Sequence, residues 1–508
     1  MNTGSIKNYD SEFCGSIPLN LINQIQAHGI LVVLDSDFTI RQVSENINKF
    51  FKDCKTTDFL DQNISSFIEA KQLKIIKEKL KLNDKIPLIL EVSLKDEKVS
   101  FHTLMHVKQD YFILELEQIN ESEPPNSFAN IYNEIKYIMT ALKKAASTNE
   151  LCQTAAEEIK KLSGFDKVLF YKFDKDWNGL TIAEAKEADM EKYLGLHFPA
   201  SDIPKQARAL YLKNPYRLIP DREYSAVKII PIINPVSNTF TDLSDCNLRS
   251  VPAVHIEYLR NMKIVASMSI PIIVNNELWG LISCHHKTAK YPDYEMRSAF
   301  ELLSNIILSE VSAKENQKGL VYKTQLNTVK SKLVELLYSN DEITEAITSS
   351  NHILELLNST GVAIAYQGQL KTIGKTPSPN QISGIIYWLQ RSAVNKVFYT
   401  DSLPRLYTSS EDYKETASGL IALPITGNKG DYILGFKPEA IQTVEWGGNP
   451  NEAITIENDG KTYHPRNSFS IWQETVKATS APWDMLEVEA AEQFRTSVLE
   501  RIIKEKAE

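Results

Sequence analysis

Two arginines and two serines in the middle of the chain are suited to binding an acidic small molecule. Arg217 and Arg249 fit a ligand that carries two carboxylates, because a guanidinium grips a carboxylate with paired hydrogen bonds. Ser267 and Ser269 stand two residues apart in an apolar segment, so on a strand they share one face and add hydroxyl donors. Each residue alone also fits a surface charge or a satisfied core group. Periodicity does not show that they converge.

The segment FPASDIP, Phe198–Pro204, has a simpler interpretation beside a functional one. Ser201 or Asp202 can cap a helix that begins near Pro204, a position where proline is favoured. A helix start alone would account for Asp202. Tyr211 then lies on this helix.

Other kinds of chemistry have no signature in the chain. There is no GxSxG, P-loop, GxGxxG or HExxH motif. Cys284, His285 and His286 are consecutive on a predicted strand, where neighbours point to opposite faces, so we expect no metal there. The five cysteines form no CxxC pair, and neither a zinc site nor a disulfide framework is indicated. Cys14 stands apart because its N-terminal segment has no predicted structure.

Composition sets the broad class. The chain has 508 residues with 56 basic and 65 acidic side chains, a net charge of −9. That length predicts about three domains. The mild acidity and the lack of a basic run argue against nucleic-acid binding. No apolar stretch approaches the ~18 residues of a membrane helix, and no signal peptide is recognisable, so we expect a cytoplasmic protein without membrane contact.

The predicted elements form three α+β units, each an antiparallel sheet with flanking helices. Strands are expected at 29–35, 39–44 and 111–117 with a helix at 64–82, then at 167–173, 180–185, 266–274 and 278–285, and finally at 362–366, 419–425 and 432–436. Residues 123–127 (EPPNS) predict a linker. One long helix, or two meeting near Gly319, spans 294–337, and another helix covers 485–506.

Several long motifs resemble those of bacterial phytochromes, in the same order. Phe13–Asp35 is similar to the segment in which an early cysteine precedes a PAS domain. FPASDIP, Arg249–Met262 (RSVPAVHIEYLRNM), ASMSI and LWGLISCHH resemble the GAF domain, while VEWGGNP and HPRNSF resemble the two arms of the PHY-domain tongue. The resemblance implies a PAS region at 1–122, GAF at 128–312, PHY at 318–485 with a tongue at about 440–475, and a signalling helix at 486–508.

The resemblance implies a covalently bound biliverdin, a linear tetrapyrrole. Cys14 would form the thioether. The residue directly before His255, which other phytochromes use for attachment, is Val254, and Cys246 does not match that position. The other implied binding residues are Tyr171, Phe198, Asp202, Ile203, Pro204, Tyr211, Arg217, Arg249, His255, Tyr258, Ser267, Ser269 and His285.

Each implied binding residue has a role in the resemblance. The Asp202 backbone carbonyl would lie near the pyrrole nitrogens, and His255 would stack near the pyrrole rings and hydrogen-bond a shared water. One propionate would contact Arg217, Arg249 and Tyr211, and the other Ser267, Ser269 and His255. His285 would hydrogen-bond the ring D carbonyl, with Tyr171, Phe198 and Tyr258 around that ring. Pro252 stands where the family has a hydroxyl residue, so one propionate contact is expected to be missing.

The tongue would carry the signal. Arg466 would pair with Asp202 in the dark state, and Ser468 could replace it after light. Asn458-Asp459-Gly460 can turn a hairpin, while Phe469–Val476 contains no helix breaker, so refolding toward a helix is allowed.

The sequence leaves the partners and one alternative function open. A homodimer through the long helices and a downstream output module or response regulator are expected. We expect no enzyme activity and no kinase within this chain. The alternative is a GAF protein that senses a small ligand without photochemistry.

Overall fold

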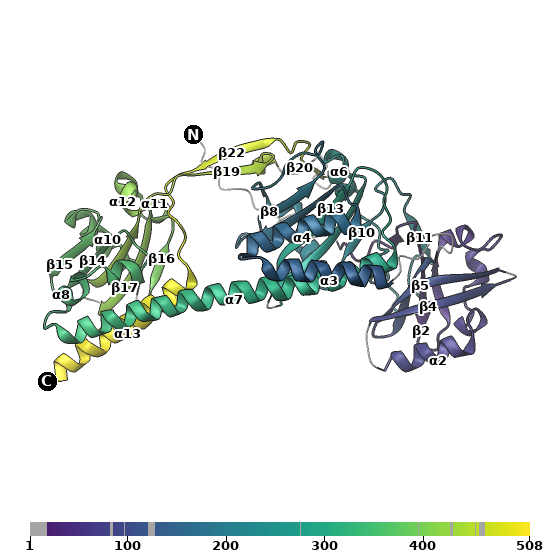
Figure 1. The fold of residues 1–508 in the computed structure, drawn as a ribbon, viewed down its shortest axis with the longest axis horizontal. Coiled ribbons are helices and arrows are strands. Elements are labelled where there is room, and N and C mark those ends of the chain that lie inside the picture. The colour runs from purple at the N-terminus through teal and green to yellow at the C-terminus, as the bar shows by residue number, and fades with distance from the viewer. Residues whose placement is uncertain are drawn as a thin grey trace. The chain divides into compact units, whose positions relative to one another are not determined.

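The computed structural model describes residues 18–81, 85–95, 97–119, 128–274, 276–394, 396–426, 430–452, 454–456 and 463–507. They form two compact units (Figure 1). The described parts of 1–312 and 445–472 make the first unit, and those of 313–444 and 473–508 make the second. No helix in these ranges is long and apolar enough to cross a membrane.

The N-terminal sheet of the first unit has seven strands in the order β1-β11-β3-β2-β6-β5-β4. Its strands are β1 (Gln24–Ile25), β2 (Ile30–Asp35), β3 (Ile40–Ser44), β4 (Lys85–Leu94), β5 (Glu97–Val107), β6 (Tyr111–Gln118) and β11 (Val227–Ile230). Strand β11 comes from a much later part of the chain and pairs with both β1 and β3. A strand from the later domain therefore completes this sheet between β1 and β3.

The helix expected at 64–82 is wrong in its extent. A 3-10 turn, Ile64–Ser66, is capped by the Asn63 side chain, and α2 covers only Ala70–Lys79. Glu69 has extended backbone and acts as the N-cap of α2. Glu69 divides the segment, because its extended backbone separates the 3-10 turn from α2.

The second sheet of the first unit has the order β10-β12-β13-β7-β8-β9-β19-β22. Its strands are β7 (Lys167–Phe173), β8 (Gly179–Lys186), β9 (His197–Phe198), β10 (Arg217–Ile219), β12 (Ala266–Val274), β13 (Glu277–His286), β19 (Gln442–Gly447) and β22 (Ile471–Val476). Helices α3 (Phe128–Lys144) and α4 (Thr148–Ser163) cover one face, where they bury apolar side chains with the start of α7 (Figure 1). The opposite face carries α5 (Lys205–Tyr211) and α6 (Ala253–Asn261).

Helix α7 runs without a break from Tyr294 to Ser339. A glycine inside a helix costs only about 1 kcal/mol relative to alanine, so Gly319 does not end it. Of the two arrangements that the sequence allowed, the single helix is the one observed.

The second unit contains a five-stranded antiparallel sheet in the order β15-β14-β18-β17-β16. The strands are β14 (Gly361–Tyr366), β15 (Gln369–Gly374), β16 (Phe398–Thr400), β17 (Gly419–Thr426) and β18 (Asp431–Lys437). Shorter helices are α8 (Ile343–Thr348), α9 (His352–Leu356), α10 (Pro379–Arg391), α11 (Leu403–Leu406) and α12 (Lys414–Ala417). Helix α13 (Met485–Ala507) packs along the later part of α7 through Phe494 and Leu333.

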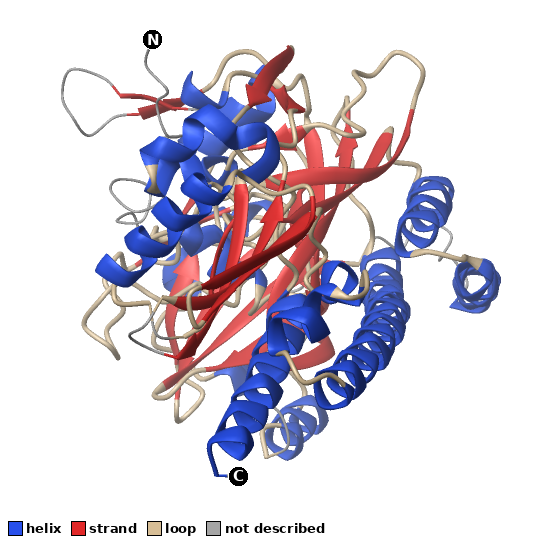
Figure 2. Ribbon diagram, turned by 90° about the vertical axis from the view of Figure 1, so that its left-hand side faces the viewer, coloured by secondary structure: helices blue, strands red, loops and turns tan. Residues whose placement is uncertain are grey.

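All three domains mix helices with antiparallel strands (Figure 2), which confirms the predicted fold class. The tongue adds a small pair of strands, β20 (Ile454–Ile456) and β21 (Tyr463–Pro465). The predicted turn at Asn458-Asp459-Gly460 and the linker at 123–127 lie outside the described residues.

A buried ion pair joins the N-terminal domain to the first turns of α7. Arg297 donates from both Nη atoms to the two oxygens of Glu117, each at 2.8 Å. Tyr291 also donates to Glu117, and Arg297 donates to the hydroxyl of Tyr216 at 3.2 Å. Both charged side chains are buried, so each depends on the other for compensation.

We expect the Glu117–Arg297 pair to make stability depend on acidity. Burial alone would raise the pKa of Glu117, but the charge of Arg297, with His28, lowers it to about 2. The unfolded value is about 4.3. The contribution is therefore complete above pH 4.3 and is lost as the pH falls toward 2. Glu117→Gln should lose this pH-dependent part and lower stability at pH 7 by about 3–5 kcal/mol, since Arg297 stays buried without its partner.

Urea unfolding of the wild type and of Glu117→Gln at pH 7, 5 and 3.5 measures this difference. Glu78→Gln, at an exposed position of α2, is the matched control and should follow the wild type. If Glu117→Gln and the wild type lost the same free energy of unfolding between pH 7 and pH 3.5, the prediction would be contradicted.

Candidate functional site

A cavity of about 1120 Å³, including its open mouth, lies against α5 and α6. Such a volume suits a ligand at the upper end of ordinary small-molecule sites. Its wall is formed by Leu19, Ser201, Asp202, Ile203, Pro204, Gln206, Ala207, Leu210, Tyr211, Asn214, Arg217, Ile219, Arg249, Val251, Pro252, Val254, His255, Tyr258, Ile454 and Pro465. Eight of the predicted binding residues are among these.

Arg217 and Arg249 line the same cavity from different elements. Arg217 begins β10, and its guanidinium donates to the backbone carbonyls of Asn247 (2.8 Å), Arg249 (2.5 Å) and Ser250 (3.1 Å). Arg249 is buried, and its Nη1 has no hydrogen-bond partner. No acidic side chain among the described residues forms an ion pair with either arginine.

The electrostatics of this wall favour an anion. Burial and the neighbouring charge of Arg249 lower the pKa of Arg217 to about 9, and burial also lowers the pKa of Arg249. Two buried guanidiniums that repel each other are unfavourable until a negative group enters. A ligand with carboxylates would supply such groups.

Asp202 contacts the tongue. Arg466 Nη2 lies 2.5 Å from Asp202 Oδ2, and the Tyr258 hydroxyl donates to the same oxygen at 2.8 Å. The Arg466 and Asp202 side chains are only 3% and 5% exposed. Burial raises the pKa of Asp202, while Arg466 and Tyr258 oppose that shift. Arg466 therefore stabilises the ionised carboxylate.

The interpretation of Ser201 or Asp202 as a helix cap is wrong. Helix α5 begins at Lys205 with Pro204 as its N-cap, and no side chain caps it. Asp202 instead ends a 3-10 turn, Ala200–Asp202, and turns its carboxylate to Arg466. A charged guanidinium stabilises a buried carboxylate more strongly than a neutral backbone N–H does.

The two serines follow the strand pattern beside Arg217. Ser269 lies opposite Arg217, and Ser267 lies opposite His285, across adjacent strands. Directly opposite residues share a face, so the arginine, the two serines and the histidine lie on one side of the sheet. Tyr211 shares a side-chain hydrogen bond with Ser269.

Two histidines of the site are held neutral. Burial, with the charge of Arg217, lowers the pKa of His255 to about 4. Burial and the charges of Lys167 and His255 lower the pKa of His285 to about 3. His285 Nδ1 is buried without a partner, so it can bond to a polar group of a ligand. His255 stacks on Tyr258 with ring centroids 5.9 Å apart.

Aromatic residues form a cluster next to the cavity. Tyr171, Phe198 and Tyr258 belong to it, together with Phe469 from the tongue. The rings of Tyr171 and Phe198 are 5.9 Å apart, and Phe469 meets Tyr258 edge-on at 5.2 Å. Tyr171, Phe198, Ser267, Ser269 and His285 do not line the cavity itself, so the structure brings them beside it rather than into its wall.

Two glycines let the tongue approach this cluster closely. A Cβ on Gly447 would lie 2.7 Å from the Phe198 ring. Gly448 has φ +101°, and a Cβ there would lie 2.3 Å from the backbone oxygen of Ser468. The Ser468 hydroxyl is exposed and bonds to Ser470 at 3.1 Å, so Asp202 has Arg466 and not Ser468 as its tongue partner here.

Polar atoms in the wall are left without partners. In the wall, the buried atoms without a hydrogen-bond partner include Ser201 Oγ, both amide atoms of Gln206 and Arg249 Nη1. Tyr171 Oη and His285 Nδ1, beside the wall, also lack a partner. Buried polar groups are ordinarily hydrogen-bonded, so this concentration fits a ligand that carries both donors and acceptors. Sequence reasoning missed Gln206 and Leu19, whose only signal was closeness to predicted site residues.

Cys14 lies outside the described residues. Leu19, five residues later, lines the cavity.

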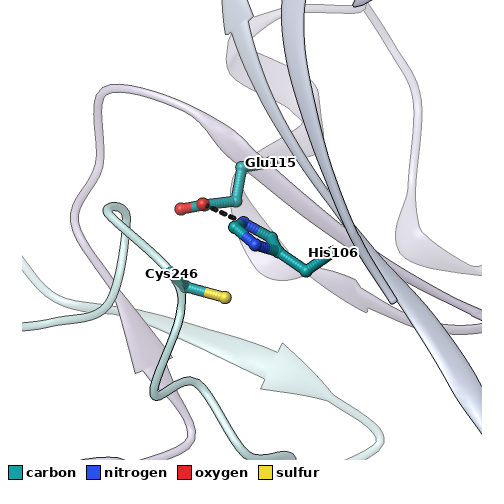
Figure 3. Close-up of side chains that lie close together, drawn as sticks. All are labelled: His106, Glu115 and Cys246. Atoms are coloured by element: carbon teal, nitrogen blue, oxygen red, sulfur yellow. Dashed lines mark hydrogen bonds and ion pairs between the residues drawn. The ribbon is translucent and has the colours of Figure 1, made fainter. Parts of the chain in front are cut away.

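One other group of potential ligand atoms is formed by residues of β5, of β6 and of the loop that contains Cys246 (Figure 3). Within the described ranges, His106, Glu115 and Cys246 place one such atom each within 4.8 Å of the others. Glu115 already accepts from His106 at 2.6 Å and from the Leu248 N–H at 2.5 Å. Burial raises the pKa of the Cys246 thiol well above its usual value. We interpret the group as a polar contact within the apolar layer between two domains.

Comparison with known proteins places the chain in a family. The profiles of the PAS fold, the GAF domain and the phytochrome region match residues 14–119, 147–309 and 326–507. The chain is 41% identical to cyanobacterial phytochrome B of Nostoc sp. over 496 residues, 96% of this chain and 66% of that protein. A bacteriophytochrome of Pseudomonas aeruginosa is 30% identical over 97% of this chain and 67% of its own length.

Solved structures of phytochromes are also similar to this chain. The crystal structure of bacteriophytochrome RpBphP3 from R. palustris has a TM-score of 0.84 at 33% identity, covering 97% of this chain and 99% of that one. The photosensory core module of the Stigmatella aurantiaca phytochrome has a TM-score of 0.83 at 33% identity, covering 96% and 97%.

The three domains and their cavity define a ligand-binding sensor module. The chain belongs to the phytochrome family of photoreceptors, which bind a linear tetrapyrrole chromophore. It spans 66% and 64% of the length of the two Nostoc phytochromes that it matches.

Proposed function

We propose that the chain is the sensory part of a red/far-red photoreceptor that binds biliverdin covalently at Cys14. The observation that carries this proposal is the pair of half-buried Arg217 and buried Arg249, which lack an acidic partner among the described residues and line one cavity. A propionate of biliverdin would supply the carboxylate that this pair lacks. The arginine pair is also compatible with a non-photochemical sensor of an acidic ligand, and Cys14 and the tongue motifs favour the bilin.

The residues of the site have distinct tasks in this proposal. Arg217, Arg249 and Tyr211 hold one propionate, and Ser267, Ser269 and His255 hold the other. Neutral His285 hydrogen-bonds the ring D carbonyl, and Tyr171, Phe198 and Tyr258 surround that ring. The Asp202 backbone carbonyl and His255 face the pyrrole nitrogens, while Ile203 and Pro204 pack against the ring system.

Attachment is an addition that needs no oxidant. The Cys14 S–H adds across a vinyl double bond of the bilin: one S–C bond forms, the C=C becomes a single bond, and the thiol proton ends on carbon. Leu19, which lines the cavity, follows Cys14 by five residues in the sequence, and this closeness supports the assignment.

Signalling would pass through the tongue. Light-driven rotation of ring D against ring C is the chemistry that the bound chromophore supplies. Tyr258 and Phe469 pack together, and Tyr258 also binds Asp202, so movement of this ring disturbs the Asp202–Arg466 pair. Tongue residues then refold between two packings of similar free energy, and α7 and α13 carry the change to an output module, in a homodimer formed through the long helices.

Expression with a source of biliverdin tests the proposal. Absorbance is recorded after red and after far-red light, and a denaturing gel with zinc detects bound bilin by fluorescence. We expect a reversible difference spectrum and a fluorescent band that Cys14→Ser removes. A colourless wild-type protein would overturn the proposal in favour of the ligand sensor, and colour without photoconversion would overturn the tongue mechanism.

A further inference from the structure

Gln206 is the one residue of the cavity wall whose carboxamide forms no hydrogen bond within the described part of the protein. It lies in the first turn of α5 and lines the cavity beside Ile203 and Leu210. Its Oε1 and Nε2 are both buried, and neither has a hydrogen-bond partner. A buried amide without hydrogen bonds is unfavourable, so a polar ligand group is the expected partner.

The chemistry of an amide narrows the kind of partner. A carboxamide presents an acceptor oxygen and a donor N–H side by side. A lactam presents the same two groups in a cis arrangement, so the two can form a pair of hydrogen bonds. Carboxylates, in contrast, accept only and are matched by the guanidiniums of Arg217 and Arg249.

Biliverdin has a lactam at each end, on rings A and D. His285, with its unpartnered Nδ1, is the residue assigned to ring D. In the proposed function the thioether joins Cys14 to ring A, and Leu19, five residues after Cys14 in the sequence, lines the same cavity as Gln206. The ring A lactam is therefore the group left for the amide.

We propose that Gln206 is a positioning residue that recognises the ring A lactam of the bilin through its side-chain amide. This inference rests on the proposed function. It also predicts specificity, because a tetrapyrrole whose terminal ring lacks the lactam carbonyl would leave the buried amide without an acceptor for its N–H.

The test uses the whole chain assembled with biliverdin. Infrared spectra of the wild type, Gln206→Leu and His285→Leu resolve the two lactam C=O stretches. We expect Gln206→Leu to move one band to higher wavenumber and His285→Leu to move the other. In a Cys14→Ser background, where binding is reversible, Gln206→Leu should bind biliverdin about 5- to 10-fold more weakly, the loss of one net hydrogen bond.

Two controls separate this role from a structural one. Gln153→Leu removes an amide in the same domain that is already bonded to Glu157 and to the Glu184 backbone, so it should lower stability and leave both bands in place. Gln206→Leu should be at least as stable as the wild type without bilin. Unchanged bands and affinity in Gln206→Leu would overturn the inference alone, whereas failure of the wild type to take up biliverdin would overturn the proposed function with it.

Discussion

Arg466→Ala is expected to leave bilin attachment intact while it releases the tongue and impairs the far-red-absorbing state. The side chain holds Asp202 at 2.5 Å, and its guanidinium lies 4.7 Å from the Phe469 ring centroid and 5.5 Å from that of Phe198. Removing one partner of a buried ion pair costs about 3–5 kcal/mol, because the other charge stays buried. The substitution leaves Cys14, the proposed attachment site, unchanged.

Three measurements check the Arg466 prediction. The zinc gel reports attachment, the light-minus-dark spectrum reports photoconversion, and hydrogen exchange of residues 463–472 reports docking of the tongue. Arg260→Ala is the matched control, since Arg260 is 55% exposed and pairs with Glu223 on the surface. Wild-type exchange and a wild-type photocycle in Arg466→Ala would remove the pair from the mechanism.

The pH dependence of Arg466→Ala gives a second signature. Burial already raises the pKa of Asp202, and loss of the arginine removes the opposing influence. Protonation then neutralises a buried charge that nothing compensates, so the variant should regain stability as the pH falls through the raised pKa. The double variant Asp202→Asn with Arg466→Ala lacks both charges, and Asp202→Asn alone completes the set. The double variant should lack this pH dependence, and the resulting cycle isolates the coupling between the two residues.

The sequence predicted strands best where apolar runs are long. Residues 167–173 and 266–274 are strands because nearly every side chain is buried. The long strands β4 and β5 were missed. Their side chains are partly exposed and include charged residues, and Pro87 interrupts β4, so neither an apolar run nor a clean alternation marks them.

Local sequence patterns could not predict that the residues of the site come together in space. Asp202 and Arg466 are 264 residues apart, and only the fold brings the tongue onto the cavity. A helix cap was the best local explanation of Asp202, and it is wrong because a distant arginine competes for the carboxylate. The family resemblance named eight residues that the structure places in one cavity wall, whereas Gln206 has no local pattern that distinguishes it from a surface glutamine.

Arg249→Met is expected to weaken bilin binding strongly without lowering the stability of the protein that lacks bilin. Arg249 Nη1 has no partner, and the charge of Arg249 is one of the causes that lower the pKa of Arg217. A methionine of similar length removes this repulsion and can fill the same space. A charge-assisted hydrogen bond contributes about 1.5–3 kcal/mol, so the dissociation constant for biliverdin should rise roughly 10- to 150-fold.

The Arg249 prediction is measured in a Cys14→Ser background, where binding is reversible, with melting temperatures taken with and without biliverdin. Arg260→Met, outside the cavity, should keep the wild-type affinity. A structural role for Arg249 would give the opposite pattern: a lower melting temperature without bilin and an unchanged affinity. The expected pattern, stability kept and affinity lost, arises only if the buried guanidinium is held ready for a carboxylate that the protein does not itself supply, because such a charge stabilises the complex and not the empty fold.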